Sequence, residues 1–498
     1  MTQGSETAAA AIKRGEGTGK RAIWSFLRVT LALFLGVWSI WVLESARAGL
    51  ERTEMRAGPT PVHKISNGGG GPAVVMAHGF AGSWQMMQGY AHVLAQAGYT
   101  VYAFDFEGHG RHTVPMSGDV TSEDGTTRLL VNQTLKVIEL ARLDTAQDDQ
   151  PVAMLGHSMA TDVLVRAAAE AENIGPLVLL ATFSGAVTPD HPKNMLLITG
   201  EWEPRLQGFA NDAVAGGAAG VMRDAMVAPA VEHVAILHSR AGRAASLEWL
   251  NDFYDRTVMV PVGQTGWALI GLLAAITVLF APVTRLFPTQ AAIPDSLSWR
   301  HLSIVVAVPM VAAPVLSAPL ETHFLPVLVA DYLAIHLLIY GAVQMALMIW
   351  LGHRPGRLSK LGAVLVLVWT IAVFGFALDR YGANFWPTPQ RLAIIAALAV
   401  GAVPFMFSDS WVVHGASLTH RIVARMGFLV SLAIAVAIDF EGLFFLILIA
   451  PVIVLFYFSF GSIGRVSARH FGPTGAGLAL GLALAWALGV SFPLFSAA

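Results

Sequence analysis

Ser158 has the sequence surroundings of a nucleophile that attacks carbonyl groups. It stands in Gly156-His157-Ser158-Met159-Ala160, between an apolar run and a helical pattern. Small residues on both sides of a serine let the chain turn sharply from a strand into a helix and hold the hydroxyl above a sheet. A serine at this place could also simply cap the helix. Partners for acid–base chemistry are therefore needed to favour catalysis.

Three further features lie where a serine nucleophile needs partners. The segment His78-Gly79-Phe80 follows an earlier buried run, so the backbone N–H of Phe80 could pair with that of Met159 to stabilise an oxyanion. The order serine, acid, histidine along the chain suits this chemistry. The candidate acids and bases after Ser158 follow that order: Glu203 or Glu201, then His233 or His238.

The elements that must position these residues are strands alternating with helices, which predicts a mostly parallel sheet flanked by helices. In open sheets of this kind, ligand-facing loops gather at the carboxyl ends of the strands. The candidate residues follow such runs. We expect strands at 73–77, 100–106, 152–155, 177–181 and 195–199, and helices at 84–97, 127–143, 161–172 and 242–254.

Four motifs in this order resemble the α/β-hydrolase superfamily and its serine esterases and lipases. They are Val74 to Phe80, Phe104 to Arg111, Gly156 to Ala160 and Leu196 to Glu203. The resemblance covers residues 72–256 and is silent about the substrate. It implies that Ser158 is the nucleophile, Glu203 the orienting acid and His233 the base, with the oxyanion held by Phe80 and Met159.

The motifs depart from the usual pattern at two positions. Ala160 replaces the second glycine of the turn around the serine, and the acid is glutamate rather than the commoner aspartate. The spacing from Gly200 favours Glu203 over Glu201. We favour His233 over His238, which directly precedes the expected helix cap. Two other histidines are expected to be structural, His109 in a turn and His157 beneath the serine.

The second half of the chain has the composition of a membrane domain. The whole chain is 55% hydrophobic and 13% charged, about half the charge of an ordinary soluble domain. Residues 1–258 hold 46 of the 64 charged side chains, and residues 259–498 hold 18. The net charge of −2 gives no reason to expect nucleic acid as a partner. Cysteine is absent, which excludes disulfides and thiolate metal sites.

Nine apolar runs are long enough to cross a bilayer as helices. They lie at 23–44, 264–284, 301–319, 325–351, 361–378, 390–408, 422–438, 442–461 and 474–495. The pair 422–438 and 442–461 could instead be one re-entrant hairpin. The first run resembles a cleavable signal peptide, but its length favours an uncleaved anchor.

The distribution of Lys and Arg predicts how these spans are oriented. Positively charged short loops stay in the cytoplasm. The N-terminal tail and four alternate loops carry the positive charges: Lys13, Arg14, Lys20 and Arg21; Arg285 and Arg300; Arg354, Arg357 and Lys360; Arg421; Arg465 and Arg469. We therefore expect a multi-pass protein of a bacterial inner membrane, with a cytoplasmic tail at 1–22, an anchor at 23–45, a linker at 46–71, an extracytoplasmic α/β-hydrolase domain at 72–258 and a membrane domain at 259–498.

The sequence thus predicts a membrane-anchored serine hydrolase that cleaves carboxylic esters, with membrane lipids or other hydrophobic acyl compounds as substrates. No motif indicates a cofactor or a metal ion. A rival hypothesis is a transporter or membrane scaffold whose hydrolase-like domain only binds. It would depend on polar groups in the run 325–351, where ionisable residues are costly and therefore functional candidates: Asp331 and His336.

Overall fold

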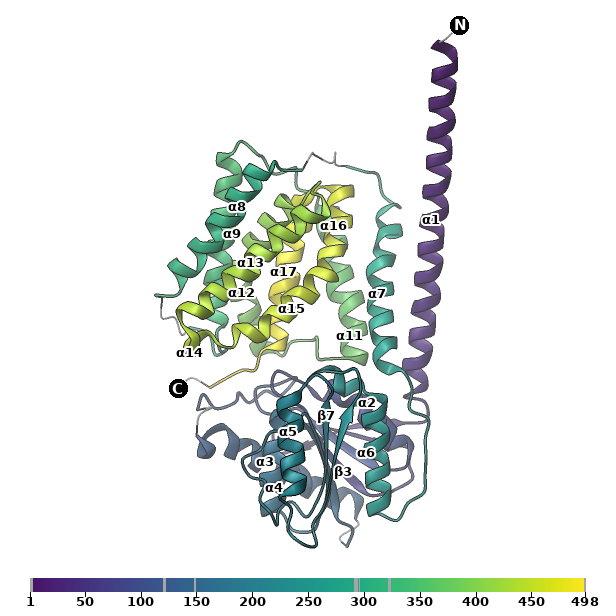
Figure 1. Cartoon of the computed structure of the whole chain (residues 1–498), viewed down its shortest axis with the longest axis vertical. Coiled ribbons are helices and arrows are strands. Elements are labelled where there is room, and N and C mark those ends of the chain that lie inside the picture. Colours follow the sequence, from purple (N-terminus) through teal and green to yellow (C-terminus); the bar gives the residue numbers. More distant parts are fainter. Residues whose placement is uncertain are drawn as a thin grey trace.

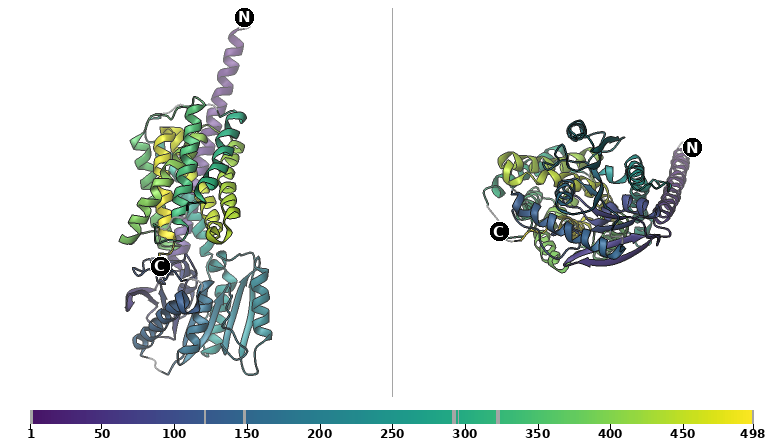
Figure 2. Two further views of the ribbon diagram at one scale, coloured as in Figure 1. Left: turned by 90° about the vertical axis from the view of Figure 1, so that its left-hand side faces the viewer. Right: turned by 90° about the horizontal axis from the view of Figure 1, so that it is seen from below.

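The computed structural model describes residues 3–119, 122–146, 149–290, 294, 296–320 and 324–496, with side chains described from residue 23 onward. It consists of an α/β domain and a helical bundle stacked end to end, with the long first helix running beside the bundle (Figures 1 and 2).

Eight strands of the α/β domain form one sheet in the order β1-β2-β4-β3-β5-β6-β7-β8. Strand β2 pairs antiparallel with both β1 and β4, whereas the six strands β3 to β8 run parallel to one another. The predicted mostly parallel sheet is therefore confirmed. The strands are β1 (Glu51–Ala57), β2 (Thr60–Ser66), β3 (Ala73–Ala77), β4 (Thr100–Phe104), β5 (Val152–His157), β6 (Ile174–Leu180), β7 (Asn194–Gly200) and β8 (Met222–Ala228).

Helices cover both faces of the sheet and give it two apolar cores (Figure 1). One core packs against α2 and α6 through side chains such as Tyr90 and Leu247. The other packs against α3, α4 and α5 through side chains such as Val131 and Val163. These helices are α2 (Gln88–Gln96), α3 (Arg128–Thr145), α4 (Met159–Glu170), α5 (Pro204–Ala215) and α6 (Arg240–Phe253).

The structure differs from the sequence-based expectation at both edges of the sheet. Segment 46–71, expected to be a linker, contains the hairpin β1–β2 that extends the sheet. At the other edge, β8 pairs with β7 over seven residues and was not expected. Both outermost strands carry charged side chains, as edge strands often do, and therefore lack the apolar pattern of the inner strands.

The helical bundle contains the predicted spans. Among the described residues, nine helical segments are long and apolar enough to cross a membrane. The pair suspected of being one hairpin forms two segments of spanning length, α13 (Leu418–Ile438) and 446–471. The other segments are 23–45 within α1 (Gln3–Ser45), α7 (Thr265–Thr284), α8 (Trp299–Ser317), α9 (Ala330–Trp350), 360–381, α12 (Pro389–Val412) and α17 (Pro473–Ser491).

The helices at the centre of the bundle pack through small residues. A Cβ added to Gly401 of α12 would lie 2.0 Å from the carbonyl oxygen of Ala334, and one added to Gly341 of α9 would lie 2.5 Å from the backbone nitrogen of Phe405. Gly481 of α17 is as close to Val403 of α12. Such close backbone approach provides the van der Waals contact that holds helices together in lipid.

The bundle rests on the loops at the carboxyl ends of the parallel strands (Figure 1). The buried guanidinium of Arg391 donates a hydrogen bond of 2.8 Å to the carbonyl oxygen of Gly108, which follows β4. Arg111 forms an ion pair of 2.7 Å with Asp379. Beyond α17 the chain returns to this loop, where Phe495 forms a β-bridge with Met116. The carboxyl ends of the parallel strands, which the candidate residues follow, therefore face the bundle.

Candidate active site

The turn after β5 holds Ser158 in an unusual backbone conformation. Its φ is 52° and its ψ is −119°, a region that costs about 1–3 kcal/mol for a residue with a side chain. Two glycines make the turn possible: a Cβ at Gly156 would lie 2.6 Å from the Leu164 side chain, and one at Gly79 would lie 3.1 Å from the Ser158 Cβ. The methyl group of Ala160 would be 3.2 Å from that Gly156 Cβ, so Gly156 leaves room for it.

Three of the predicted residues lie together in one hydrogen-bonded row. The Ser158 hydroxyl is 2.8 Å from Nε2 of His233, and Nδ1 of the same imidazole is 2.6 Å from Oε1 of Glu203. The second oxygen of Glu203 accepts a hydrogen bond of 3.0 Å from the backbone N–H of Gly200 at the end of β7. A carboxylate fixed in this way holds His233 with Nδ1 protonated and Nε2 directed at the serine.

The two alternatives left open by the sequence lie outside this row. Glu201 accepts a hydrogen bond of 2.6 Å from the backbone N–H of Ala230 and braces the loop after β8. His238 lies beside Arg243, and burial together with that guanidinium lowers the pKa of its imidazole to about 4. Its carbonyl oxygen accepts a hydrogen bond from Arg243. The structure thus groups Glu203 and His233 with Ser158, and leaves Glu201 and His238 in structural contacts.

The two candidate oxyanion donors flank the serine. Met159 is the first residue of α4, where backbone N–H groups have no partner within the helix. Phe80 follows Gly79, whose backbone passes against Ser158. Among the described residues, the backbone N–H of neither Phe80 nor Met159 donates a hydrogen bond to a loop carbonyl oxygen or to a side chain. Both donors are therefore available for a developing negative charge beside Ser158.

A layer of buried histidines supports the row from below. Nε2 of His157 lies 2.7 Å from the carbonyl oxygen of His233 and holds the loop that carries it. Burial and the nearby His233 lower the pKa of His157 to about 3, so its imidazole is neutral and can donate this hydrogen bond. His78 accepts a hydrogen bond from the Phe106 N–H, and burial lowers its pKa. The sequence predicted that His157 packs beneath the serine, but it gave no sign of the contact between His157 and the carbonyl oxygen of His233.

An aromatic side chain from the bundle lies over the candidate site. The ring of Phe445, between α14 (Phe440–Leu443) and α15 (Leu446–Phe458), is 5.5 Å from that of Phe80, centroid to centroid. Exposed large apolar side chains also follow β6 and β7 and precede Phe445 in the chain: Phe183, Trp202, Phe440 and Phe444. The α/β domain contributes only a short loop after β6, and the contact of Phe445 with Phe80 comes from the bundle.

The polar groups singled out in the bundle lie in two different settings. Asp331 stands in the first turn of α9, at the end nearest the α/β domain, and accepts a hydrogen bond of 2.8 Å from the backbone N–H of Leu325. His336 is completely buried and bridges α9 and α13: its Nδ1 is 3.1 Å from the Tyr332 hydroxyl and its Nε2 is 3.0 Å from the Ser431 hydroxyl. Asp331 is thus a helix-start carboxylate, which suits the helix dipole.

Among the residues that the structure describes, no group of three or more His, Asp or Glu side chains could hold a metal ion.

Comparison with known proteins places the α/β domain in a class. Residues 71–246 match the family model described as "Serine aminopeptidase, S33". Similar solved structures include a dienelactone hydrolase from Anabaena variabilis (18% identity, 41% of this chain and 97% of that one, TM-score 0.34). A monoglyceride lipase variant from Saccharomyces cerevisiae matches at 11% identity (41% and 94%, TM-score 0.33), and a bacterial membrane phospholipase A at 12% (49% and 99%, TM-score 0.33).

The strand order, the turn at Ser158 and the family match define an α/β-hydrolase domain. This domain is joined to a bundle with nine apolar helical segments, counted over the described residues, which fits a multi-pass membrane protein.

Proposed function

We propose that this protein is a membrane-anchored serine hydrolase that cleaves carboxylic esters of hydrophobic acyl compounds. The observation that carries the proposal is the hydrogen-bonded row from Ser158 through His233 to Glu203, at the carboxyl ends of β5, β8 and β7. A serine hydroxyl is a weak nucleophile by itself, and an adjacent oriented base is what activates it.

The row supports a two-step reaction. The Ser158 oxygen attacks the ester carbonyl while its proton passes to Nε2 of His233, and the backbone N–H groups of Phe80 and Met159 stabilise the oxyanion. The C–O bond to the alcohol then breaks, the alcohol takes the proton from His233, and an acyl-serine remains. Water repeats the attack with His233 as base, which releases the acid and restores the serine.

The surroundings of the row favour a hydrophobic substrate. The site faces the bundle, and the ring of Phe445 lies 5.5 Å from that of Phe80, whose backbone N–H is one of the candidate oxyanion donors. The exposed rings of Trp202, which follows β7, and Phe440, five residues before Phe445, offer apolar surface for an acyl chain. Excluding water from such a site strengthens the electrostatic interactions inside it.

The test of this function is labelling of the full-length protein by a fluorophosphonate probe, together with hydrolysis of a panel of acyl esters of increasing chain length. We expect Ser158→Ala to remove both labelling and hydrolysis. The matched control is Ser184→Ala, which removes a buried hydroxyl of the same domain that is bonded to Asp162 at 2.7 Å. Labelling that persists in Ser158→Ala and disappears in Ser184→Ala would contradict the proposal.

We further propose that the α/β domain lies outside the cytoplasm of a bacterial inner membrane. The positively charged loops and the N-terminal helix extend from the opposite end of the bundle (Figure 1), and such loops stay in the cytoplasm. The absence of cysteine makes a direct test possible. An impermeant maleimide should label the exposed variant Leu143→Cys in spheroplasts, and label Arg300→Cys only after permeabilisation. The reverse pattern would invert the proposed topology.

A further inference from the structure

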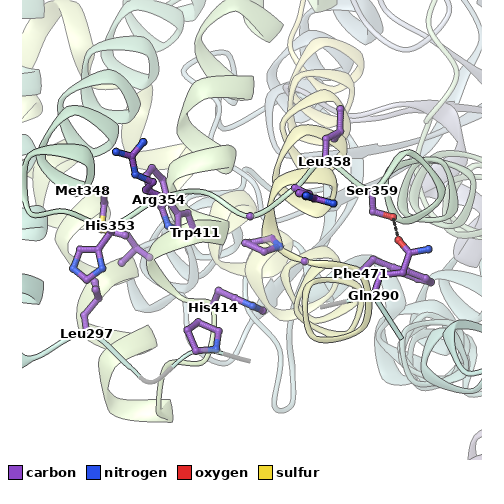
Figure 3. A pocket seen from close by; sticks show the side chains of 16 residues that line it. Gln290, Leu297, Met348, His353, Arg354, Leu358, Ser359, Trp411, His414 and Phe471 are labelled. Atoms are coloured by element: carbon purple, nitrogen blue, oxygen red, sulfur yellow. Dashed lines mark hydrogen bonds between the residues drawn. The ribbon is translucent and has the colours of Figure 1, made fainter. Parts of the chain in front are cut away.

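A large cavity opens at the end of the bundle opposite the α/β domain, and it has no part in the proposed hydrolysis (Figure 3). Its volume is about 630 Å³. Described residues of four chain segments form its wall: residues 290, 294 and 297 between α7 and α8, the connection after α9, the end of α12, and the turn between α16 (Phe460–Phe471) and α17. A space of this size holds a small ligand or the headgroup of a lipid.

The polar part of the wall is cationic. Arg354 and Arg357 line the cavity together with His353, and no acidic residue is among the described residues that line it. Within the described residues these two guanidinium groups form no ion pair, whereas the nearby Arg425 is paired with Asp409 at 3.1 Å. The chain has one acid between residues 286 and 320, Asp295, which lies outside the described residues.

Two helices begin at the same cavity. Ser359 and Pro473 are lining residues, and they stand at the N-terminal ends of α10 (Lys360–Leu367) and α17. The Ser359 hydroxyl accepts a hydrogen bond from the Gly362 N–H of α10, and α17 begins with a proline. The partial positive charge of each helix end, rather than free N–H groups, is what favours a bound anion here. The helix ends thus add to the field of Arg354 and Arg357.

Tryptophans place the cavity at the level of lipid headgroups. Trp299 at the start of α8 is 56% exposed and Trp350 at the end of α9 is 74% exposed. Indole side chains gather at the membrane–water interface. The lining residues Leu297 and Met348 are each two positions from one of these tryptophans, and with Trp411 they give the cavity an apolar side.

We propose that this cavity binds a phosphate-bearing ligand, and that its source is the headgroup of an anionic phospholipid in the adjacent leaflet. Arg354 and Arg357 recognise the phosphate, and the apolar side accommodates the glycerol and the first acyl carbons. A basic pocket between transmembrane helices at the interface suits such a headgroup. This site is separate from Ser158 and stands whether or not the protein is an esterase.

The experiment is native mass spectrometry of the full-length protein in detergent, titrated with phosphatidylglycerol or phosphatidylcholine of the same acyl chains. We expect phosphatidylglycerol to be retained preferentially, and the double variant Arg354→Gln/Arg357→Gln to weaken its binding about tenfold or more. The matched control is Arg300→Gln, which neutralises an exposed arginine at the same end of the bundle that does not line the cavity.

A second variant tests the site without removing an arginine. Gly356 lines the cavity, and a Cβ there would meet only Pro473 Cδ at 3.6 Å, an ordinary contact. Gly356→Glu should therefore fold normally and also weaken phosphatidylglycerol binding, because it adds a negative charge beside the phosphate. The unfolding midpoint of each variant without lipid checks the fold.

Three outcomes would overturn the proposal or its assigned source. Equal retention of the two lipids would show that the cavity does not select the net negative charge of phosphatidylglycerol, and that Arg354 and Arg357 do not form a binding site for it. An effect of Arg300→Gln as large as that of the double variant would show only general surface attraction. Displacement of phosphatidylglycerol by millimolar inorganic phosphate, in the natural chain but not in the double variant, would replace the membrane source with free phosphate.

Discussion

Both halves of this protein contain a hydrogen-bonded serine–histidine pair, and the pair in the α/β domain is the one that we propose to be catalytic. In the α/β domain, Nε2 of His233 is 2.8 Å from the Ser158 hydroxyl. In the bundle, Nε2 of His336 is 3.0 Å from the Ser431 hydroxyl. The residue types and the distances are nearly the same, so the pairs differ in what surrounds them.

The partner on the other ring nitrogen separates the two pairs. His233 faces the carboxylate of Glu203, which can stabilise a positive imidazole, whereas His336 faces the neutral hydroxyl of Tyr332. The His233 side chain is 42% exposed and His336 is not exposed at all. A short serine–histidine distance therefore does not by itself make the serine a nucleophile. A carboxylate, access for a substrate and nearby oxyanion donors make the difference.

The largest expected effect tests this comparison directly. His233→Ala should lower ester hydrolysis by about 10⁵-fold or more, because the base of such a triad acts as one unit with the serine. His336→Ala should leave kcat/KM unchanged and instead lower the unfolding temperature, because it removes a buried link between α9 and α13. Steady-state kinetics and thermal unfolding of both variants provide the measurement. Loss of hydrolysis only in His336→Ala would favour the transporter or scaffold hypothesis.

The next effect concerns the carboxylate. Glu203→Gln should lower kcat by about 10⁴-fold, because an amide leaves the imidazole in the wrong tautomer and cannot balance its charge. The matched control, Glu201→Gln, lies two residues away, where the Glu201 carboxylate accepts a hydrogen bond from the backbone N–H of Ala230. It should retain activity within a few-fold. Equal losses in the two variants would mean that the geometry around Glu203 does not decide the activity.

The sequence could predict the inner part of the site because its residues follow strands with a clear apolar pattern. Strands β3, β5 and β7 are almost entirely buried, and the motifs with His78, Ser158 and Glu203 come directly after them. His233 follows β8, whose charged side chains kept this edge strand from being recognised in the sequence. The choice between His233 and His238 therefore could not use the position of β8. The distance from His233 to Ser158 depends on tertiary packing, which no local pattern encodes.

The contact between Phe445 of the bundle and Phe80 of the candidate site could not be predicted from the sequence for a similar reason. Phe445 and Phe80 are more than 360 positions apart, and nothing in either segment indicates that they meet. The hold of His157 on the carbonyl of His233 is also a contact between distant segments. Apolar length, in contrast, is a local property, so the nine spans were found with ends within a few residues, apart from the long eighth segment.

A smaller effect is expected from Phe445, the aromatic residue of the bundle that contacts Phe80. Phe445→Ala should lower kcat/KM for long-chain esters about tenfold relative to short-chain esters, because it removes apolar contact above Phe80. The matched control, Phe444→Ala, changes the neighbouring aromatic residue, which does not contact Phe80 in the described structure. Hydrolysis of esters of increasing chain length gives the measurement. An unchanged preference in Phe445→Ala would show that the bundle takes no part in substrate selection.

The smallest effect concerns His157, whose imidazole contacts the carbonyl oxygen of His233. Burial and His233 lower the pKa of His157 to about 3 in the folded state, against about 6.5 in the unfolded chain. Between these values the unfolded chain binds a proton that the folded protein does not, so stability is full above about pH 6.5 and falls as the pH decreases.

His157→Gln should reduce this loss, because glutamine does not titrate and can still donate to the carbonyl of His233. We expect the unfolding temperature of the variant to fall by about 2–4 °C less per pH unit between pH 6 and pH 4. His238 and His63 have pKa values lowered to about 4 by burial and should leave a remaining slope of the same sign. A variant with the same pH slope as the natural chain would mean that His157 is protonated in the folded state. In that case a positive charge lies beneath His233, and the support itself would oppose the protonation that catalysis requires.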